Sequence, residues 1–247
     1  MNKKAIIGIC CGVAAIAAIV LVIVLMNKGD DLSNIRNISV FEMNGSVKIA
    51  RDGKNMDAVK NMKLRSGDDV EVGDGSYLRL CLDDDKYVYA DAGTKMRVIA
   101  EGTAANSKTR IAVAEGTVIT EVQNKLSGDS SFDVVTPNST MAIRGTSTYS
   151  EVKYYKPEPE EAPGASIDEY RIIEKNAILE GSGSISYNDS EMGTAVNTNL
   201  GAGEGITISK KVEKKPLLDE LSKHPVCPPA TLNGADYISF EETLKKL

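Results

Sequence analysis

Side chains that commonly carry out nucleophilic or metal chemistry are scarce in this chain of 247 residues. The only histidine is His224, and its place beside Pro225 favours a solvated loop residue. Because nucleophilic triads and zinc sites usually use histidine, we predict no catalytic residue, no metal ligand and no cofactor. Acidic residues are numerous, so a carboxylate pair for glycoside hydrolysis is an alternative, although no pair stands out. An extracellular hydrolase is therefore the least favoured function.

Three consecutive aspartates, Asp83 to Asp85, follow a clear strand pattern, and Asp91 comes soon after them. Outside a cell, such carboxylates could attract calcium. The triplet lacks, however, the alternating ligand spacing of a known calcium loop. We predict a solvated hairpin tip, with calcium binding as the alternative.

The trio Arg144, Gly145 and Thr146 is the other polar motif of interest. Gly145 suits a tight bend or a close approach of two backbone segments. Arg144 could brace a neighbouring carboxylate or loop carbonyl groups. We expect a structural role for the trio, with contact to a ligand as the alternative.

Four cysteines are present, and two of them, Cys10 and Cys11, lie in a long apolar run. Only Cys81 and Cys227 remain outside that run, so the chain is not a disulfide-rich scaffold. We expect two unrelated thiols; a disulfide between Cys81 and Cys227 is the alternative.

The elements that would carry these residues are short strands. Between residues 38 and 152, glycine-containing turns recur about every 8–12 residues, which is typical of an all-β sandwich or roll of antiparallel strands. Residues 77–82 place three leucines on one face and Tyr, Arg and Cys on the other. A hairpin is predicted between residues 111–113 and 118–122, with its turn at Glu115-Gly116. Further strands are predicted at 132–134 and 141–143, and residues 56–64 as a short helix or an irregular connection.

The composition changes after residue 152. Residues 153–169 are rich in Pro and Glu and are predicted to form an exposed insertion. Strand patterns return at 170–173, 177–179, 184–187 and 205–209, so residues 170–209 are predicted to extend the domain. The tail, residues 212–247, is predicted to be partly helical, with a stretch around residues 217–221 and a closing amphipathic helix near residues 240–247.

An uncharged run at residues 5–26 predicts a membrane anchor. Its 22 residues would span about 33 Å as a helix, slightly more than a hydrocarbon core of about 30 Å. Lys3 and Lys4 precede the run, which predicts a cytoplasmic stub at residues 1–4 and an extracytoplasmic remainder. A cleaved signal peptide is the rival interpretation, but the run is long and no small-residue cleavage site follows it. A buried core helix is the least favoured, because the run has no polar face.

The charge of the chain excludes one class of partner. The whole sequence carries a net charge of −6, and without the three lysines that flank the apolar run it carries about −9. A protein that binds nucleic acid needs a basic face to neutralise phosphates. We therefore predict no nucleic-acid partner.

Three stretches, in order, resemble the FecR domain of bacterial envelope proteins. They are FEMNGSVKIARDGK with the following LRSGDDVEVGDGSYLRLCLDDDKYVYADAGTKMRV, then IAVAEGTVITEV, and then FDVVTPNSTMAIRGTSTYSEV. The last contains Thr-Pro followed by Arg-Gly-Thr, the most recognisable motif of the family. The resemblance covers residues 38–152, and YRIIEKNAILEGSGSISY is similar to an extra hairpin that often follows.

The resemblance implies an all-β extracytoplasmic domain. Well-known members of the family pass a signal through one transmembrane helix to a cytoplasmic sigma factor. Only Met1 to Lys4 precede the apolar run in this sequence. We therefore do not expect a sigma regulator.

These observations favour a non-enzymatic, single-pass membrane protein that binds another envelope or surface protein, or a cell-wall polymer. Exposed sheet edges and an acidic surface suit protein contacts. The alternative is a signalling component that acts by association of its membrane helix, since Gly8 and Gly12 form a Gly-x-x-x-Gly pattern.

Overall fold

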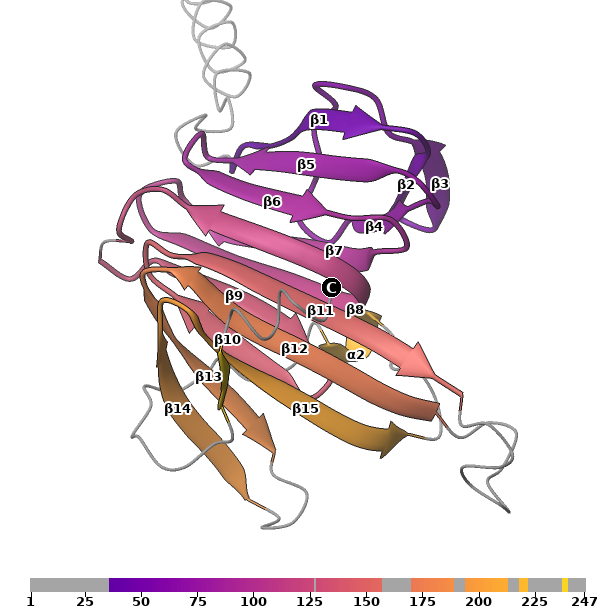
Figure 1. Ribbon diagram of the computed structural model, residues 1–247. Coiled ribbons are helices and arrows are strands. Elements are labelled where there is room, and N and C mark those ends of the chain that lie inside the picture. The colour runs from indigo at the N-terminus through magenta and orange to yellow at the C-terminus, as the bar shows by residue number, and fades with distance from the viewer. Residues whose placement is uncertain are drawn as a thin grey trace, which may run out of the picture. The chain divides into compact units, whose positions relative to one another are not determined.

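The computed structural model describes residues 36–126, 128–156, 170–188, 194–212, 218–221 and 237–239 (Figure 1). Contacts divide the chain into two units, Met1–Ile35 and Arg36–Leu247, and every described residue belongs to the second. The predicted anchor at residues 5–26, with Gly8 and Gly12, lies outside the described residues. So do most of the predicted insertion and the predicted closing helix. Within the described ranges, no helix is long and apolar enough to cross a membrane.

The described residues confirm the all-β expectation. In the described part of the chain, sixteen strands form one connected sheet, and the strand pairs are antiparallel except for β8 with β9. The sheet divides at β8 into two halves, which we call sheet A and sheet B. A four-residue helix, α2 (Leu218–Leu221), also lies in the described part of the chain.

Sheet A contains, in spatial order, β1 (Ile38–Asn44), β5 (Tyr77–Leu82), β6 (Lys86–Ala90), the C-terminal part of β8 (Ser107–Val122), β11 (Ser147–Tyr155), β12 (Tyr170–Glu180), β15 (Glu204–Val212) and β16 (Tyr237–Ser239). Sheet B contains β3 (Lys54–Asp57), β2 (Val47–Arg51), β4 (Asp69–Val72), β7 (Lys95–Gly102), the N-terminal part of β8, β9 (Ser131–Thr136), β10 (Ser139–Ile143), β13 (Ser182–Asn188) and β14 (Ala195–Gly201).

Strand β8 belongs to both sheets. Its first part pairs with β7 in sheet B, and from Gly116 onward it pairs with β11 in sheet A. The prediction of a hairpin turn at Glu115-Gly116 is therefore wrong, because the chain bends and continues as one strand. Gly116 permits the bend: its φ is +98°, and a Cβ at this position would lie 2.4 Å from the Cα of Thr94.

One hydrophobic core combines side chains from the two sheets. Alternation along β5 buries Leu78, Leu80 and Leu82, as the sequence pattern predicts. These side chains belong to the same cluster as Val70 of β4 and Met96 of β7 in sheet B. Burial of this apolar surface is the main stabilising contribution to the fold.

A carboxyl group, Glu174 of β12, also lies inside this core and is 0% exposed. Its Oε2 accepts a hydrogen bond of 2.6 Å from the Thr136 hydroxyl, and its Oε1 accepts bonds of 2.8 and 2.6 Å from the backbone N–H and the side-chain amide of Asn138. Burial raises the pKa of Glu174 to about 7, although these hydrogen bonds act in the opposite direction. The group connects sheet A to the turn between β9 and β10 of sheet B.

Other predicted elements differ in their extent. The two strands predicted at 170–173 and 177–179 are one continuous strand, β12. Strand β14 has no counterpart among the predictions, because its sequence, AVNTNLG, contains only two large apolar residues. Residues 58–64 form an irregular connection with turns after β3, so the alternative of a short helix at 56–64 is wrong.

Candidate binding surface

The outer face of sheet A carries a cross-strand row of large side chains. Arg79 on β5 lies opposite Tyr89 on β6, Tyr89 opposite Ile119 on β8, and Ile119 opposite Tyr149 on β11. Successive residues of a strand point to opposite faces, so the neighbours of these residues, such as Leu80 and Val118, enter the core. The row continues with Ala177 on β12, where the side chains become small.

Arg79 fixes the aromatic part of this face. Its guanidinium carbon lies 4.8, 4.4 and 4.5 Å from the ring centres of Phe41, Tyr87 and Tyr89. Phe41 and Tyr87 meet edge to face, with their centres 5.7 Å apart. Each contact between a cation and an aromatic face contributes about 0.5–1 kcal/mol at an exposed site. The rings are therefore held in place before any ligand arrives.

A pocket of about 580 Å³ lies beside the row. This volume falls within the range of about 300–1,000 Å³ that is usual for small-ligand sites. The pocket is formed by residues from four neighbouring strands and the turns after them: Tyr77, Leu78, Tyr89, Ala90, Asp91, Thr117, Ile119, Tyr149, Glu151 and Lys153. The lining of the pocket thus combines three tyrosine rings, two carboxylates and one amine.

Glu151 and Lys153 form the charged wall of this pocket. The Glu151 side chain is 1% exposed and forms ion pairs with Lys153 and, at 3.0 Å, with Lys175. Burial alone would raise the pKa of Glu151, but the two lysines outweigh burial and lower it. In turn Glu151 raises the pKa of Lys153, so the amine stays protonated. The ion pair therefore holds a positively charged donor at the rim.

Tyr149 has an unusual environment for a tyrosine. The residue is 5% exposed, and its hydroxyl lies near Thr117 and Glu151 but makes no well-formed hydrogen bond within the described part of the chain. Burial, together with the negative charge of Glu151, raises the pKa of this phenol. A buried hydroxyl without a partner costs free energy, so a ligand that reached it would gain a hydrogen bond at a site that is already desolvated.

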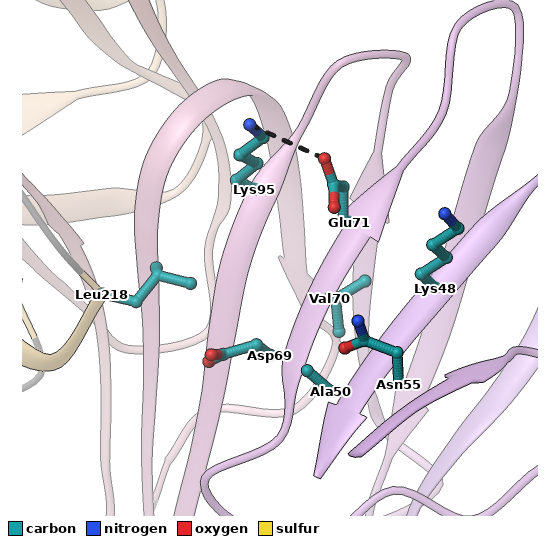
Figure 2. A pocket seen from close by; sticks show the side chains of 8 residues that line it. All are labelled: Lys48, Ala50, Asn55, Asp69, Val70, Glu71, Lys95 and Leu218. Carbon is teal, nitrogen blue, oxygen red and sulfur yellow. Dashed lines mark ion pairs between the residues drawn. The ribbon is translucent and has the colours of Figure 1, made fainter. Parts of the chain in front are cut away.

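A second, smaller pocket of about 270 Å³ lies on the outer face of sheet B (Figure 2). Figure 2 shows Leu218 of α2 at one side and Lys48 and Asn55 at the other. Lys95 pairs with Glu71 at 3.6 Å, and Asp69 pairs with Arg97 at 2.5 Å. Since these charges compensate each other and the pocket has no aromatic lining, it is the weaker candidate.

Comparison with known proteins identifies the region that contains the first pocket. Residues 68–160 match the model of the FecR family, described as FecR protein. The chain carries a FecR-family region. All the pocket residues, from Tyr77 to Lys153, lie inside it. The match begins at Asp68, later than the start at residue 38 suggested by the sequence motifs.

Similarity to solved structures is limited. Two crystal structures of "a putative anti-sigma factor from Parabacteroides distasonis ATCC 8503" are 19% identical to this chain, with a TM-score of 0.39. The alignment covers 60% of this chain and 60% of that protein. A likeness at this level decides no function. No curated protein sequence matches the chain.

Within the FecR region, the aspartate triplet is not the solvated tip predicted from the sequence. The Asp83 side chain is 3% exposed and pairs with Arg36 at 2.6 Å and with Lys86 at 3.6 Å. Lys86 also pairs with Asp85 at 2.6 Å, and Asp84 alone is exposed. The triplet is thus largely neutralised by cations, and no group of acidic, histidine or cysteine side chains in the described ranges is arranged to hold a metal ion.

The Arg-Gly-Thr motif of the FecR region lies after β10. Gly145 has a φ of +74°, and a Cβ there would lie 2.9 Å from the Cα of Lys125. Thr146 is buried, donates a hydrogen bond of 2.7 Å to the carbonyl oxygen of Ser182, and accepts one of 3.0 Å from the Val122 N–H. Arg144 is exposed. The geometry of Gly145 and Thr146 fits the structural role expected for them.

The remaining predicted residues are only partly placed. Cys81 is a buried free thiol on β5. Cys227 and His224 lie outside the described residues. Apart from Asp91, which was named with the aspartate triplet, the residues of the pocket were not singled out from the sequence. The one signal for them was the alternation in β11, which places Tyr149, Glu151 and Lys153 on the same face.

Proposed function

We propose that this protein is a membrane-anchored, extracytoplasmic binding module that attaches to another envelope component without catalysing a reaction. Its binding site is the pocket on the outer face of sheet A. The single observation that supports this most is the buried Tyr149 hydroxyl, which makes no well-formed hydrogen bond in the described part of the chain and lines a pocket of ligand size. The uncharged run at residues 5–26 supports the anchor.

Site-specific cross-linking in living cells tests the binding site. A photo-reactive amino acid replaces Ile119, which is 36% exposed in the centre of the aromatic row. A matched control places the same amino acid at Val59, which is 62% exposed on the connection after β3. We expect a discrete adduct from position 119 and none from position 59. Identical adducts from the two positions, or none from position 119, would refute the site.

The membrane topology has its own test. A C-terminal epitope tag on the full-length protein should be digested by protease added to right-side-out vesicles and should be protected in inverted vesicles. Protection in right-side-out vesicles would refute the extracytoplasmic placement.

Signalling through association of the membrane helix is the second candidate, favoured by the spacing of Gly8 and Gly12. In a membrane self-association assay, Gly12→Ile should lower the signal, because a large side chain prevents close approach of the helices. An unchanged signal would remove this candidate.

A further inference from the structure

We propose that the pocket on sheet A binds a neutral saccharide unit of a glycan chain. This inference rests on the proposed binding function and names the chemical class of its ligand. It follows from three properties of the pocket: its aromatic surface, its mixture of hydrogen-bonding groups, and its position in the middle of the sheet.

The aromatic surface suits the apolar face of a sugar ring. Tyr77, Tyr89 and Tyr149 come from three different strands, with Ile119 between the last two. A pyranose presents C–H groups on one face and hydroxyls around its edge, so it can lie on an aromatic ring while its hydroxyls reach polar neighbours. Tyrosine matches this arrangement, because an apolar ring carries a polar tip.

The polar groups of the pocket are both donors and acceptors, as sugar hydroxyls require. Asp91 is exposed and supplies carboxylate oxygens, one of which accepts a hydrogen bond of 2.8 Å from the Ala92 N–H. Lys153 supplies a protonated amine that Glu151 orients. The hydroxyl of Tyr149 can donate or accept. A ligand hydroxyl at this position would give the buried phenol a well-formed hydrogen bond.

The charges disfavour an ionic ligand. The Arg79 guanidinium lies over the Tyr89 ring and Lys153 lines the pocket, so a cation would meet a like charge at each of these places. An anion would meet Asp91 and Glu151 in the same space. A ligand charge near a like charge of the pocket costs free energy, and a neutral ligand avoids this cost.

The position of the pocket disfavours an extended peptide. Addition of a strand requires an open sheet edge with unpaired backbone groups. Strands β6, β8 and β11, however, are each paired on both sides. Recognition in the pocket therefore does not use strand addition but the groups that line the pocket, as is usual for a small polar ligand.

Binding of defined oligosaccharides to the full-length protein in detergent tests the inference. The probes are the neutral tetramers of N-acetylglucosamine, glucose and mannose, at millimolar concentration, measured by saturation-transfer NMR and calorimetry. The glucosamine tetramer is the matched cationic control, because it shares the N-acetylglucosamine backbone but carries amines. We expect at least one neutral tetramer to bind, and the glucosamine tetramer to bind less tightly.

Variants then locate the bound sugar. Tyr149→Ala should weaken binding about tenfold or more, since it removes a ring and a hydroxyl. Asp91→Ala, at an exposed position, should weaken binding without affecting folding, which thermal unfolding verifies. Tyr155→Ala is the matched control, because Tyr155 is 48% exposed on the same strand but does not line the pocket. It should leave affinity unchanged.

Three results would overturn the inference: no neutral tetramer binds, the glucosamine tetramer binds more tightly, or all three variants bind equally well. The cross-linking experiment decides the proposed binding function separately. If position 119 still forms its adduct in cells, the binding function stands even when the saccharide inference fails. If that adduct is absent, the binding function fails. The two failures are therefore distinguishable.

Discussion

The buried Glu174 carboxyl should make the stability of this protein depend on pH. Its pKa is about 7 in the folded chain, against an ordinary value of 4.5 expected after unfolding. The folded state thus holds the proton more tightly, and stability must fall as pH rises from about 4.5 to about 7. The whole shift corresponds to about 3 kcal/mol, and the part lost between about pH 6 and pH 8 is about 1.4 kcal/mol.

Glu174→Gln is the change that isolates this group. Glutamine keeps the size of the side chain and an oxygen for Asn138, and its NH₂ group can donate to the Thr136 hydroxyl. The variant stays neutral at all pH values, so it should lack this fall of about 1.4 kcal/mol. A smaller fall of about 0.4 kcal/mol should remain, because burial also raises the pKa of Asp133, to about 6.

Urea unfolding of the full-length protein at pH 6 and pH 8 provides the measurement. Glu180→Gln, at an exposed position on the same strand, is the matched control and should keep the wild-type difference between the two pH values. If Glu174→Gln shows the same fall in stability as the wild type, the carboxyl is not its source. The account of Glu174 as a buried, protonated group would then be refuted.

Three further substitutions test the fold by their effect on the free energy of unfolding, measured by urea denaturation. Gly116→Ala should cost more than about 1 kcal/mol, because its Cβ would clash with Thr94 and its φ is positive. Gly53→Ala is the control and should cost less, because Gly53 has a φ of +74° but open space around it. Equal costs for the two variants would refute the clash at Gly116. Asp83→Asn should cost about 3–5 kcal/mol because it leaves the buried Arg36 guanidinium without its carboxylate partner. Added calcium should not restore the loss, and the exposed Asp84→Asn should be near neutral. Leu80→Ala, at 0% exposure, should cost about 2–5 kcal/mol, and a cost below 1 kcal/mol would contradict its place in the core.

Local alternation predicted the strands well where one face is apolar. The leucines of β5 are an example, because burial on one side imposes a period of two. The same reasoning failed at Glu115-Gly116. A glycine with positive φ occurs both in a hairpin turn and in a bend within a strand, and only the pairing partners of β8 distinguish the two.

The candidate site was harder to predict than the strands. Tyr89 and Tyr149 are 60 residues apart in the sequence, and they lie in one row only because β8 pairs with both β6 and β11. Asp83 was misjudged for a similar reason, since its partner Arg36 comes from a segment 47 residues earlier in the chain. Neither relation leaves a periodic signal in the sequence. From the sequence alone, an aspartate run is therefore predicted to be exposed to solvent. Only the fold shows which distant cations pair with it.

The long strand β8 has a consequence for synthesis of the protein. Once residues 36–122 have emerged, β6 and β7 can already pair with β8, but β9 and β11 have not yet emerged. The nascent chain must therefore present an unpaired edge along most of its longest strand until residues 131–155 emerge. An exposed edge of this kind can pair with another chain, so a protecting chaperone would be needed most at this stage of translation.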